Sequence, residues 1–268
     1  MHRLLSVVLT AALSLAGWGS THAAADDLSD ARIIVTAKSD TVKKWHYAPR
    51  FVVVHDQAVD QSAFAEVTDF IASATGLPVK PPTFVNLTEE GFDPRFYTAS
   101  RYSPRNTGTG QMTSDLLIAQ KQDLKLSANI FVFMVSPHLA SHFIALTSYG
   151  RFTGNLTRSY VQGDGPCYFK VLSNGESIHF GTILIAPTIN PDLQRACIYE
   201  EMVQAMGLMN DAQDSTYFTF DNLPENKPRD YDQRLLEALY DPRIRNGDEV
   251  DQVLDIYASL GTEALVRQ

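Results

Sequence analysis

Three polar residues, Glu200, Glu201 and Gln204, interrupt a segment that is otherwise apolar. The other positions between Cys197 and Met209 are almost all apolar on every side of a helical wheel, which is typical of a buried helix. On that helix Glu200 and Gln204 share one face, and Gly207 continues it. A carboxylate in a protein core is costly unless it is hydrogen-bonded, paired or bound to a ligand. The pattern therefore predicts a polar site on this helix.

The spacing resembles the metal motif of zincin peptidases. In H-E-x-x-H the two histidines bind zinc and the glutamate is the general base, and metzincins extend the motif to H-E-x-x-H-x-x-G-x-x-H. When the chain is aligned with this motif, the five defined positions are occupied by Glu200, Glu201, Gln204, Gly207 and Asn210. The resemblance implies that Glu201 occupies the base position and Gly207 the turn. Both histidines are replaced, so the metal motif is degenerate.

A longer pattern also resembles a known family. The string C-x-x-E-E-x-x-Q-x-x-G-L-x-N-D ends at Asp211, and L-L-x-x-L-Y-D-P-R follows from Leu235. It is similar to uncharacterised secreted bacterial proteins that form a domain of unknown function, most clearly over residues 160–245. The resemblance implies an α+β, zincin-like fold and no known activity. Related chains usually continue with Gly-Met, where this one has Asn246-Gly247-Asp248.

Residues 1–25 have the layout of a secretory signal peptide. Arg3 is the basic part, residues 4–16 are mostly apolar, and Ala23-Ala24-Ala25 is a small-residue cleavage site. The alternative is an uncleaved anchor helix, but the apolar run is shorter than the roughly 20 residues that span a bilayer. We expect a periplasmic or secreted protein with no membrane span after cleavage. One zincin-like domain over residues 26–268 is predicted, with an α/β part to about residue 190 and a helical part from 191.

The chain has two cysteines, Cys167 and Cys197. In an exported protein two cysteines most simply form one disulfide, and the alternative is a reactive thiol. A disulfide would close a loop of about 30 residues and fix the central helix to the preceding strand region.

Hydrophobic periodicity predicts several strands, a central buried helix and a helical C-terminal part, and the zincin resemblance implies that the strands form a mixed sheet. Pro78, Pro81 and Pro82 exclude a helix there, and the segment around residues 173–176 is typical of a hairpin turn. The expected strands are 32–36, 51–55, 130–135, 168–172 and 178–185. The expected helices are 59–75 stopped by Gly76, 231–240, and 250–260 closed by Gly261.

Other candidate sites are weaker. His138 and His142 have a spacing that binds metals on a helix, but their apolar neighbours favour ordinary packing. Residues 89–129 are turn-rich and read equally as an insertion or as a flap over a cleft. The net charge of −9 becomes −10 when Arg3 is removed with the signal segment, which argues against nucleic acid and anionic membranes as partners.

Three functions remain open for the central helix. A metallohydrolase would use the oxygens of Glu200 and Gln204, which suit magnesium or calcium better than zinc. A pseudoenzyme would replace the metal by a polar network with Asn210 or Asp211, and would bind a peptide or envelope protein along an edge strand. A purely structural role would pair Glu200 with an arginine, for which the candidates are Arg195, Arg234 and Arg243. We favour the pseudoenzyme and predict no cofactor.

Overall fold

The computed structural model describes residues 18–36, 40–88, 129–136, 167–173, 177–186, 189–212 and 228–266. Within these ranges it contains a five-stranded mixed sheet and five helices, consistent with the predicted α+β class. The strands are β1 (Phe51–His55), β2 (Thr83–Asn86), β3 (Ile130–Met134), β4 (Cys167–Ser173) and β5 (Ile178–Ile185). The helices are α1 (Trp18–Val35), α2 (Gln61–Thr75), α6 (Pro191–Gln204), α7 (Asp230–Leu239) and α8 (Val250–Val266).

The strand order is β2-β1-β3-β5-β4. β1, β2, β3 and β5 are parallel to one another, whereas β4 is antiparallel to β5 and lies at the edge. All five residues of β3 are buried, as expected for a central parallel strand covered on both faces. The predicted strand at 130–135 and the hairpin between β4 and β5 are therefore confirmed.

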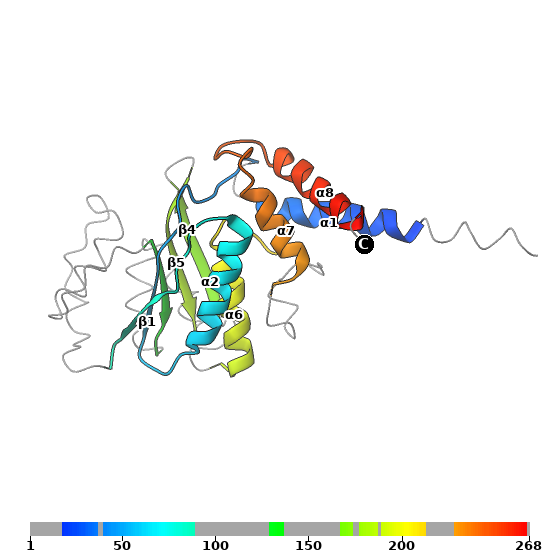
Figure 1. Ribbon diagram of the computed structural model, residues 1–268. Helices are drawn as coiled ribbons and strands as arrows, with labels where there is room; N and C mark the ends of the chain where they lie inside the picture. The colour runs from blue at the N-terminus through cyan, green and yellow to red at the C-terminus, as the bar shows by residue number, and fades with distance from the viewer. Residues whose placement is uncertain are drawn as a thin grey trace, which may run out of the picture.

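Helices α2 and α6 lie side by side on one face of the sheet (Figure 1). α2 begins where the Asp60 carboxylate accepts hydrogen bonds from the amides of Ser62 and Ala63, and it ends at Gly76 in the left-handed conformation. Its side chains Phe64, Val67 and Ile71 are fully buried in the core. The predicted helix and its glycine stop are confirmed.

The expectation of a strand at 32–36 is wrong, because Arg32 to Val35 form the last turn of α1. Ala31, Ile34 and Val35 are buried, a spacing of three and four residues that fits one face of a helix. Short apolar runs do not separate helix from strand by periodicity alone. The helical conformation is favoured here by packing, because α1 lies alongside α8 and buries one face against the core (Figure 1).

The predicted end of the last helix is also wrong. α8 continues through Gly261 to Val266. A glycine inside a helix costs only about 1 kcal/mol relative to alanine, so it does not by itself end one. A Cβ at Gly261 would lie 3.0 Å from the Arg234 guanidinium, which indicates close packing of α8 on α7 at this position.

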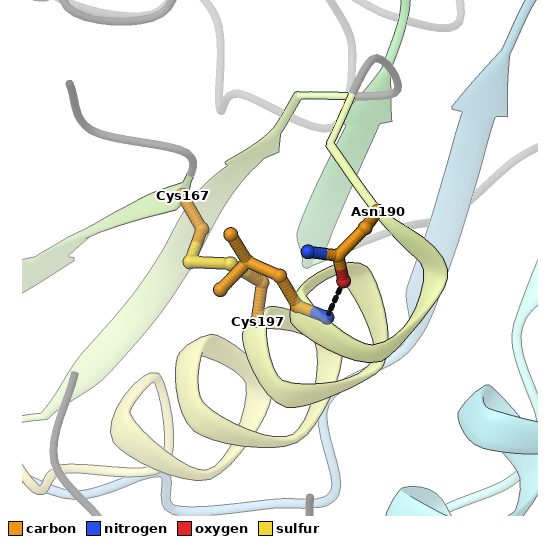
Figure 2. The surroundings of a disulfide bond; sticks show 4 residues. Cys167, Asn190 and Cys197 are labelled. Atoms are coloured by element: carbon orange, nitrogen blue, oxygen red, sulfur yellow. Dashed lines mark hydrogen bonds between the residues drawn. A yellow bond between two sulfur atoms is a disulfide. The ribbon is translucent and has the colours of Figure 1, made fainter. Parts of the chain in front are cut away.

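A cap at the amino end of α6 and a disulfide near its middle fix this helix (Figure 2). The Asn190 side chain accepts a hydrogen bond from the Leu193 amide at 2.8 Å, and Pro191 occupies the first turn. Cys197 is bonded to Cys167 with a Cα–Cα distance of 5.7 Å. The predicted disulfide therefore joins the edge strand β4 to α6.

The carboxyl end of α6 is fixed by two aromatic side chains from distant segments. The Trp45 indole donates a hydrogen bond to the Ala205 carbonyl at 2.8 Å. The Tyr240 hydroxyl donates to the Met206 carbonyl at 2.8 Å and accepts from the Trp45 amide at 3.1 Å. Burial raises the pKa of Tyr240, so the hydroxyl keeps the proton that it donates. These contacts give partners to carbonyls that follow the helix end.

Gly207 turns the chain after α6, as predicted, with a φ of +122°. A Cβ at this position would lie 2.6 Å from the Lys43 carbonyl oxygen and 3.1 Å from Leu239. The position therefore requires glycine for two reasons, its backbone conformation and its close approach to another segment.

Some expectations concern parts of the chain outside the described residues. They are the tract 89–128, the pair His138 and His142, the turn at 174–176 and the acidic loop after residue 212. Of the helices in the described part, none combines the length and apolar character needed to cross a bilayer.

Replacement of Gly207 tests the double constraint at the turn. We expect Gly207→Ala to lower the free energy of unfolding by at least about 2 kcal/mol, because strain and a steric clash add together. Gly247→Ala is the matched control: its φ is +89°, but no atom lies within 4 Å of the added Cβ. The control should lose about 1 kcal/mol. Equal losses in urea unfolding would contradict the proposed clash with Lys43.

Removal of the disulfide tests the attachment of β4 to α6. The double variant Cys167→Ala/Cys197→Ala opens a loop with a sequence separation of 30 residues. We expect a loss of about 3–4 kcal/mol in the free energy of unfolding on the chain-entropy model. Dithiothreitol should produce a similar loss in the unsubstituted protein and none in the double variant. A double variant as stable as the unsubstituted protein would refute this expectation.

Candidate functional site

The polar residues predicted on the central helix lie on α6 and in the segment that follows it. Glu200, Glu201 and Gln204 are 2%, 4% and 7% exposed. Asp211 lies beyond the turn at Gly207 and is exposed. The structure therefore brings these four side chains into one region that extends from the core to the surface.

Gln204 is engaged by Asp211. Its side-chain amide donates a hydrogen bond to the Asp211 carboxylate. The turn at Gly207 makes this contact possible, because it reverses the chain between the two residues. The sequence predicted a buried network of Glu200 and Gln204 with Asn210 or Asp211, and the hydrogen bond between Gln204 and Asp211 is one contact of that kind.

Asn210 has a different role. Its side-chain amide donates hydrogen bonds to the carbonyls of Ile33, at 3.0 Å, and Thr36. Its backbone amide also approaches the Ile34 carbonyl at 3.3 Å. Asn210 thus satisfies carbonyls at the carboxyl end of α1, which a helix leaves without internal partners. This side chain is not directed to a site on α6.

Glu201 is the least satisfied residue of the group. Its Oε2 atom is buried and has no hydrogen-bond partner. Burial raises the pKa of Glu201 well above its ordinary value, and the neighbouring charges of Glu200 and Asp211 raise it further. An isolated carboxylate in such surroundings is costly, so the protonated form is favoured.

Tyr168 of β4 lies within the electrostatic reach of Glu201. Burial raises the pKa of the Tyr168 hydroxyl, and the Glu201 charge adds to this effect. Tyr168 follows Cys167, and Glu201 lies one helical turn after Cys197. The disulfide between those cysteines therefore explains why Glu201 lies close to the edge strand. The sequence did not identify Tyr168, and the signal that could have done so was its place beside the paired cysteine.

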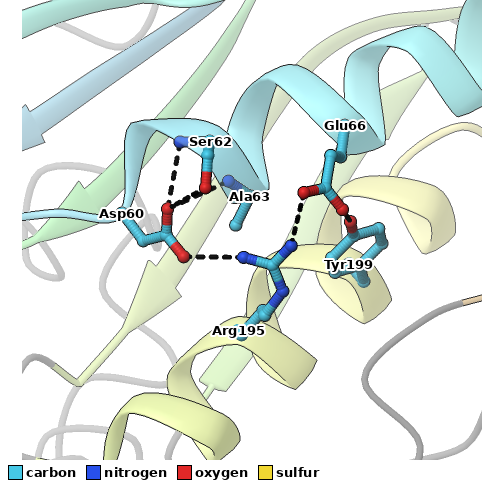
Figure 3. A network of polar contacts seen from close by, with 6 residues as sticks. All are labelled: Asp60, Ser62, Ala63, Glu66, Arg195 and Tyr199. Atoms are coloured by element: carbon cyan, nitrogen blue, oxygen red, sulfur yellow. Dashed lines mark hydrogen bonds and ion pairs between the residues drawn. The ribbon is translucent and has the colours of Figure 1, made fainter.

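The opposite side of α6 is joined to α2 by an ionic network (Figure 3). The Arg195 guanidinium contacts the carboxylates of Asp60 at 2.7 Å and Glu66 at 2.6 Å. The Tyr199 hydroxyl donates to Glu66, and Arg195 lies over the Tyr199 ring. Hydrogen bonding to Ser62 is the largest of the effects that lower the pKa of Asp60, and Arg195 contributes to the same shift.

The three arginines predicted as partners of Glu200 have other contacts. Arg195 belongs to the network with α2. Arg243 pairs with Asp241, whose pKa is lowered to about 2 mainly by this hydrogen bond. Arg234 lies over the rings of Tyr231 and Tyr257, with centroid distances of 4.8 and 5.3 Å.

The histidines are the other side chains that could bind a metal. No three histidine, cysteine, aspartate or glutamate side chains within those residues converge as a metal site would require. His179 of β5 lies in this part, and its Nδ1 is buried without a hydrogen-bond partner. The pair His138 and His142 lies outside it.

Two residues that fix the position of α6 were not predicted from the sequence. Trp45 and Tyr240 hold the carboxyl end of α6, yet they lie 160 and 34 residues from the carbonyls they contact. No local pattern marks such a partner. The only available signal was the Tyr240-Asp241-Pro242-Arg243 string in the family pattern, and it did not indicate a contact.

Glu201→Gln tests the buried carboxyl. A glutamate whose pKa is raised by folding contributes its full stability below the ordinary pKa, near 4.3, and loses it as the pH rises through the folded value. Glutamine has no charge to lose. We therefore expect the stability of Glu201→Gln relative to the unsubstituted protein to increase from pH 5 to pH 8 in urea unfolding.

Glu249→Gln is the control for this experiment, because Glu249 is exposed. The change measured for Glu201→Gln is compared with that of this variant over the same pH range. A pH-independent difference for Glu201→Gln would show that Glu201 does not titrate abnormally in the folded protein.

Comparison with known proteins assigns the chain to a family whose function is unknown. The profile described as "Protein of unknown function (DUF2927)" matches residues 26–258, well beyond the 160–245 range of the resemblance seen in the sequence. No curated protein matches the chain significantly. The same holds for the solved structures. The match covers most of the chain, and the protein therefore belongs to the DUF2927 family of proteins of unknown function.

Proposed function

We propose that this protein is an exported, catalytically degenerate zincin-like protein that binds an extended peptide, such as a segment of a cell-envelope protein, along β4. The main observation behind the proposal concerns two residues that align with the zinc-binding histidines of the zincin motif. Both side chains are hydrogen-bonded within the protein. Gln204 is hydrogen-bonded to Asp211, and Asn210 caps α1. Side chains committed in this way are poor metal ligands.

The order of elements supports the zincin-like part of the proposal. In zincins an antiparallel edge strand precedes the motif helix and lies along the cleft, where it pairs with an extended peptide. Here β4 is the antiparallel edge strand, the hairpin to β5 follows, and α6 comes next in the chain. The disulfide holds β4 against α6.

The edge strand has the properties of a peptide-binding strand. β4 has seven residues, none of them buried, and it pairs on one side with β5 and with no other described strand. Strand addition uses main-chain hydrogen bonds for affinity and side-chain contacts for specificity. Tyr168, Lys170 and Leu172 alternate with Phe169 and Val171, so the two faces of the strand differ.

Three features support export. Residues 1–25 have the layout of a signal peptide, and the family match begins at residue 26. The two cysteines form a disulfide, and such bonds persist in oxidising compartments. A periplasmic or secreted location follows from this proposal.

Peptide selection tests the proposed binding. Purified residues 26–268 would be screened against a displayed library of random peptides, and the selected peptides would be resynthesised with single N-methyl groups. We expect alternate N-methyl groups to weaken binding about tenfold each, because an added strand donates every second amide to its neighbour. The intervening positions serve as the control. An N-methyl profile without this alternation would contradict strand addition.

Measurement of the metal content tests whether the motif on α6 has lost metal binding. Mature protein prepared without chelator should contain far less than one divalent metal ion per chain by mass spectrometry, and EDTA should not change its thermal unfolding. One equivalent of metal that is lost in Glu201→Gln or His138→Ala would instead support the divalent-metal hydrolase.

A further inference from the structure

The hydrogen bonds of β5 determine which backbone groups of β4 point outward. The Gly181 amide donates a hydrogen bond to the Asn129 carbonyl, at the start of β3, at 2.8 Å. In a strand the amide and carbonyl of one residue point to the same side, and those of the next residue point to the opposite side. Gly181 therefore faces β3 with its backbone groups, and its neighbour Thr182 faces β4.

The register between β4 and β5 then separates the residues of β4 into two sets. Thr182 lies directly opposite Lys170 in this antiparallel pair, so these two residues exchange both main-chain hydrogen bonds. Phe169 and Val171, on either side of Lys170, consequently direct their amides and carbonyls away from β5. No described strand lies on that side of β4. The backbone groups of Phe169 and Val171 are thus the ones that β4 offers to an added strand.

The regular part of this edge is short. The first residue of β4 is joined to α6 by the disulfide. At the other end, the register with β5 shifts between Leu172 and Ser173, and an irregularity of this kind interrupts regular pairing. An added strand therefore pairs regularly with residues 168–172 only, and Phe169 and Val171 both lie inside this range.

The side chains of Phe169 and Val171 lie on the face of the sheet that is turned toward α6. Cys167 shares this face, because alternate residues of a strand point the same way, and it is bonded to α6. Phe169 and Val171 are half-buried and pack against the hydrophobic core. Side chains directly opposite each other on paired strands are neighbours on one face. Apolar side chains on an added strand would therefore extend the apolar face that Phe169 and Val171 begin.

We infer that the peptide bound along β4 places two apolar side chains, separated by one residue, directly opposite Phe169 and Val171. The inference rests on the proposed function and names the class of peptide, an extended segment with β-branched or aromatic residues at alternate positions. The peptide runs antiparallel to β4, the orientation that is more stable per residue. Its two apolar residues exchange main-chain hydrogen bonds with Phe169 and Val171.

A peptide suits this edge better than a second copy of the same strand. Lys170 is the middle residue of β4, and a lysine on an edge strand disfavours pairing between identical edges. When two copies of β4 pair antiparallel around Lys170, the two lysines lie directly opposite, and like charges in that position are destabilising. A peptide without a basic residue at this position avoids the repulsion.

Serine scanning of the peptides selected from the library tests the predicted side chains. We expect serine to weaken binding about three- to fivefold at two positions separated by one residue. Val171→Thr should remove the loss at one of these two positions, because threonine has a similar shape but a polar hydroxyl, and a double-mutant cycle measures this coupling. Leu172→Ala, on the opposite face of β4, is the control and should leave both losses unchanged.

Amide hydrogen exchange, measured by NMR in the unsubstituted protein, tests the pairing of the backbone. In the free protein we expect the amides of Phe169 and Val171 to exchange at least tenfold faster than those of Lys170 and Leu172, which donate to β5. A saturating selected peptide should slow Phe169 and Val171 at least tenfold and leave Lys170 unchanged. This measurement does not depend on the folding of a variant.

The possible results separate this inference from the proposed function. Selected peptides that lack apolar residues at alternate positions, or that protect other amides, would overturn the inference and leave peptide binding intact. Protection of Phe169 and Val171 in the free protein that rises with protein concentration would identify a second copy as the occupant and would also overturn it. A library that yields no bound peptide would overturn both the inference and the peptide-binding proposal.

Discussion

The position of α6 depends on hydrogen bonds at its carboxyl end. Trp45 and Tyr240 donate to the carbonyls of Ala205 and Met206, and both donors are supplied by segments far away in the sequence. Gly207 then passes so close to the Lys43 carbonyl that no side chain fits. A neutral hydrogen bond contributes only about 1 kcal/mol, but an unsatisfied buried carbonyl costs more. The end of the helix therefore has one favourable arrangement.

This arrangement determines the contacts of the polar residues around it. Because the chain reverses at Gly207, Asp211 returns to Gln204 and Asn210 reaches the end of α1. In the first half of α6 the disulfide joins the helix to β4, and the network of Arg195 joins it to α2. Exposed ion pairs contribute little to stability, so the disulfide and the buried hydrogen bonds carry more of the attachment.

The contacts of Gln204 and Asn210 are consistent with the proposed degenerate zincin-like motif. Each of these side chains is hydrogen-bonded to another part of the chain, and the proposal assigns both to positions that hold a metal in zincins. Glu201 is the exception, since it is buried and has an oxygen without a partner. A protein that retained this carboxyl only for stability would be better served by an apolar residue or by a hydrogen-bonded one. Stability alone therefore does not explain the Glu201 carboxyl.

The sequence by itself determined the features that depend on a local pattern. It also determined the disulfide, because two cysteines allow only one pairing. Helical periodicity and Gly76 defined α2, the apolar run defined β3, and a single pair of cysteines defined the disulfide. Only the tertiary structure decided that residues 32–35 are helical, that Asn210 caps α1, and that Tyr240 and Trp45 hold α6. Periodicity reports which face of an element is buried, whereas a partner a hundred residues away leaves no trace in a local pattern. Glu201 shows both sides: the sequence predicted its burial, and the fold decided that one of its oxygens lacks a partner.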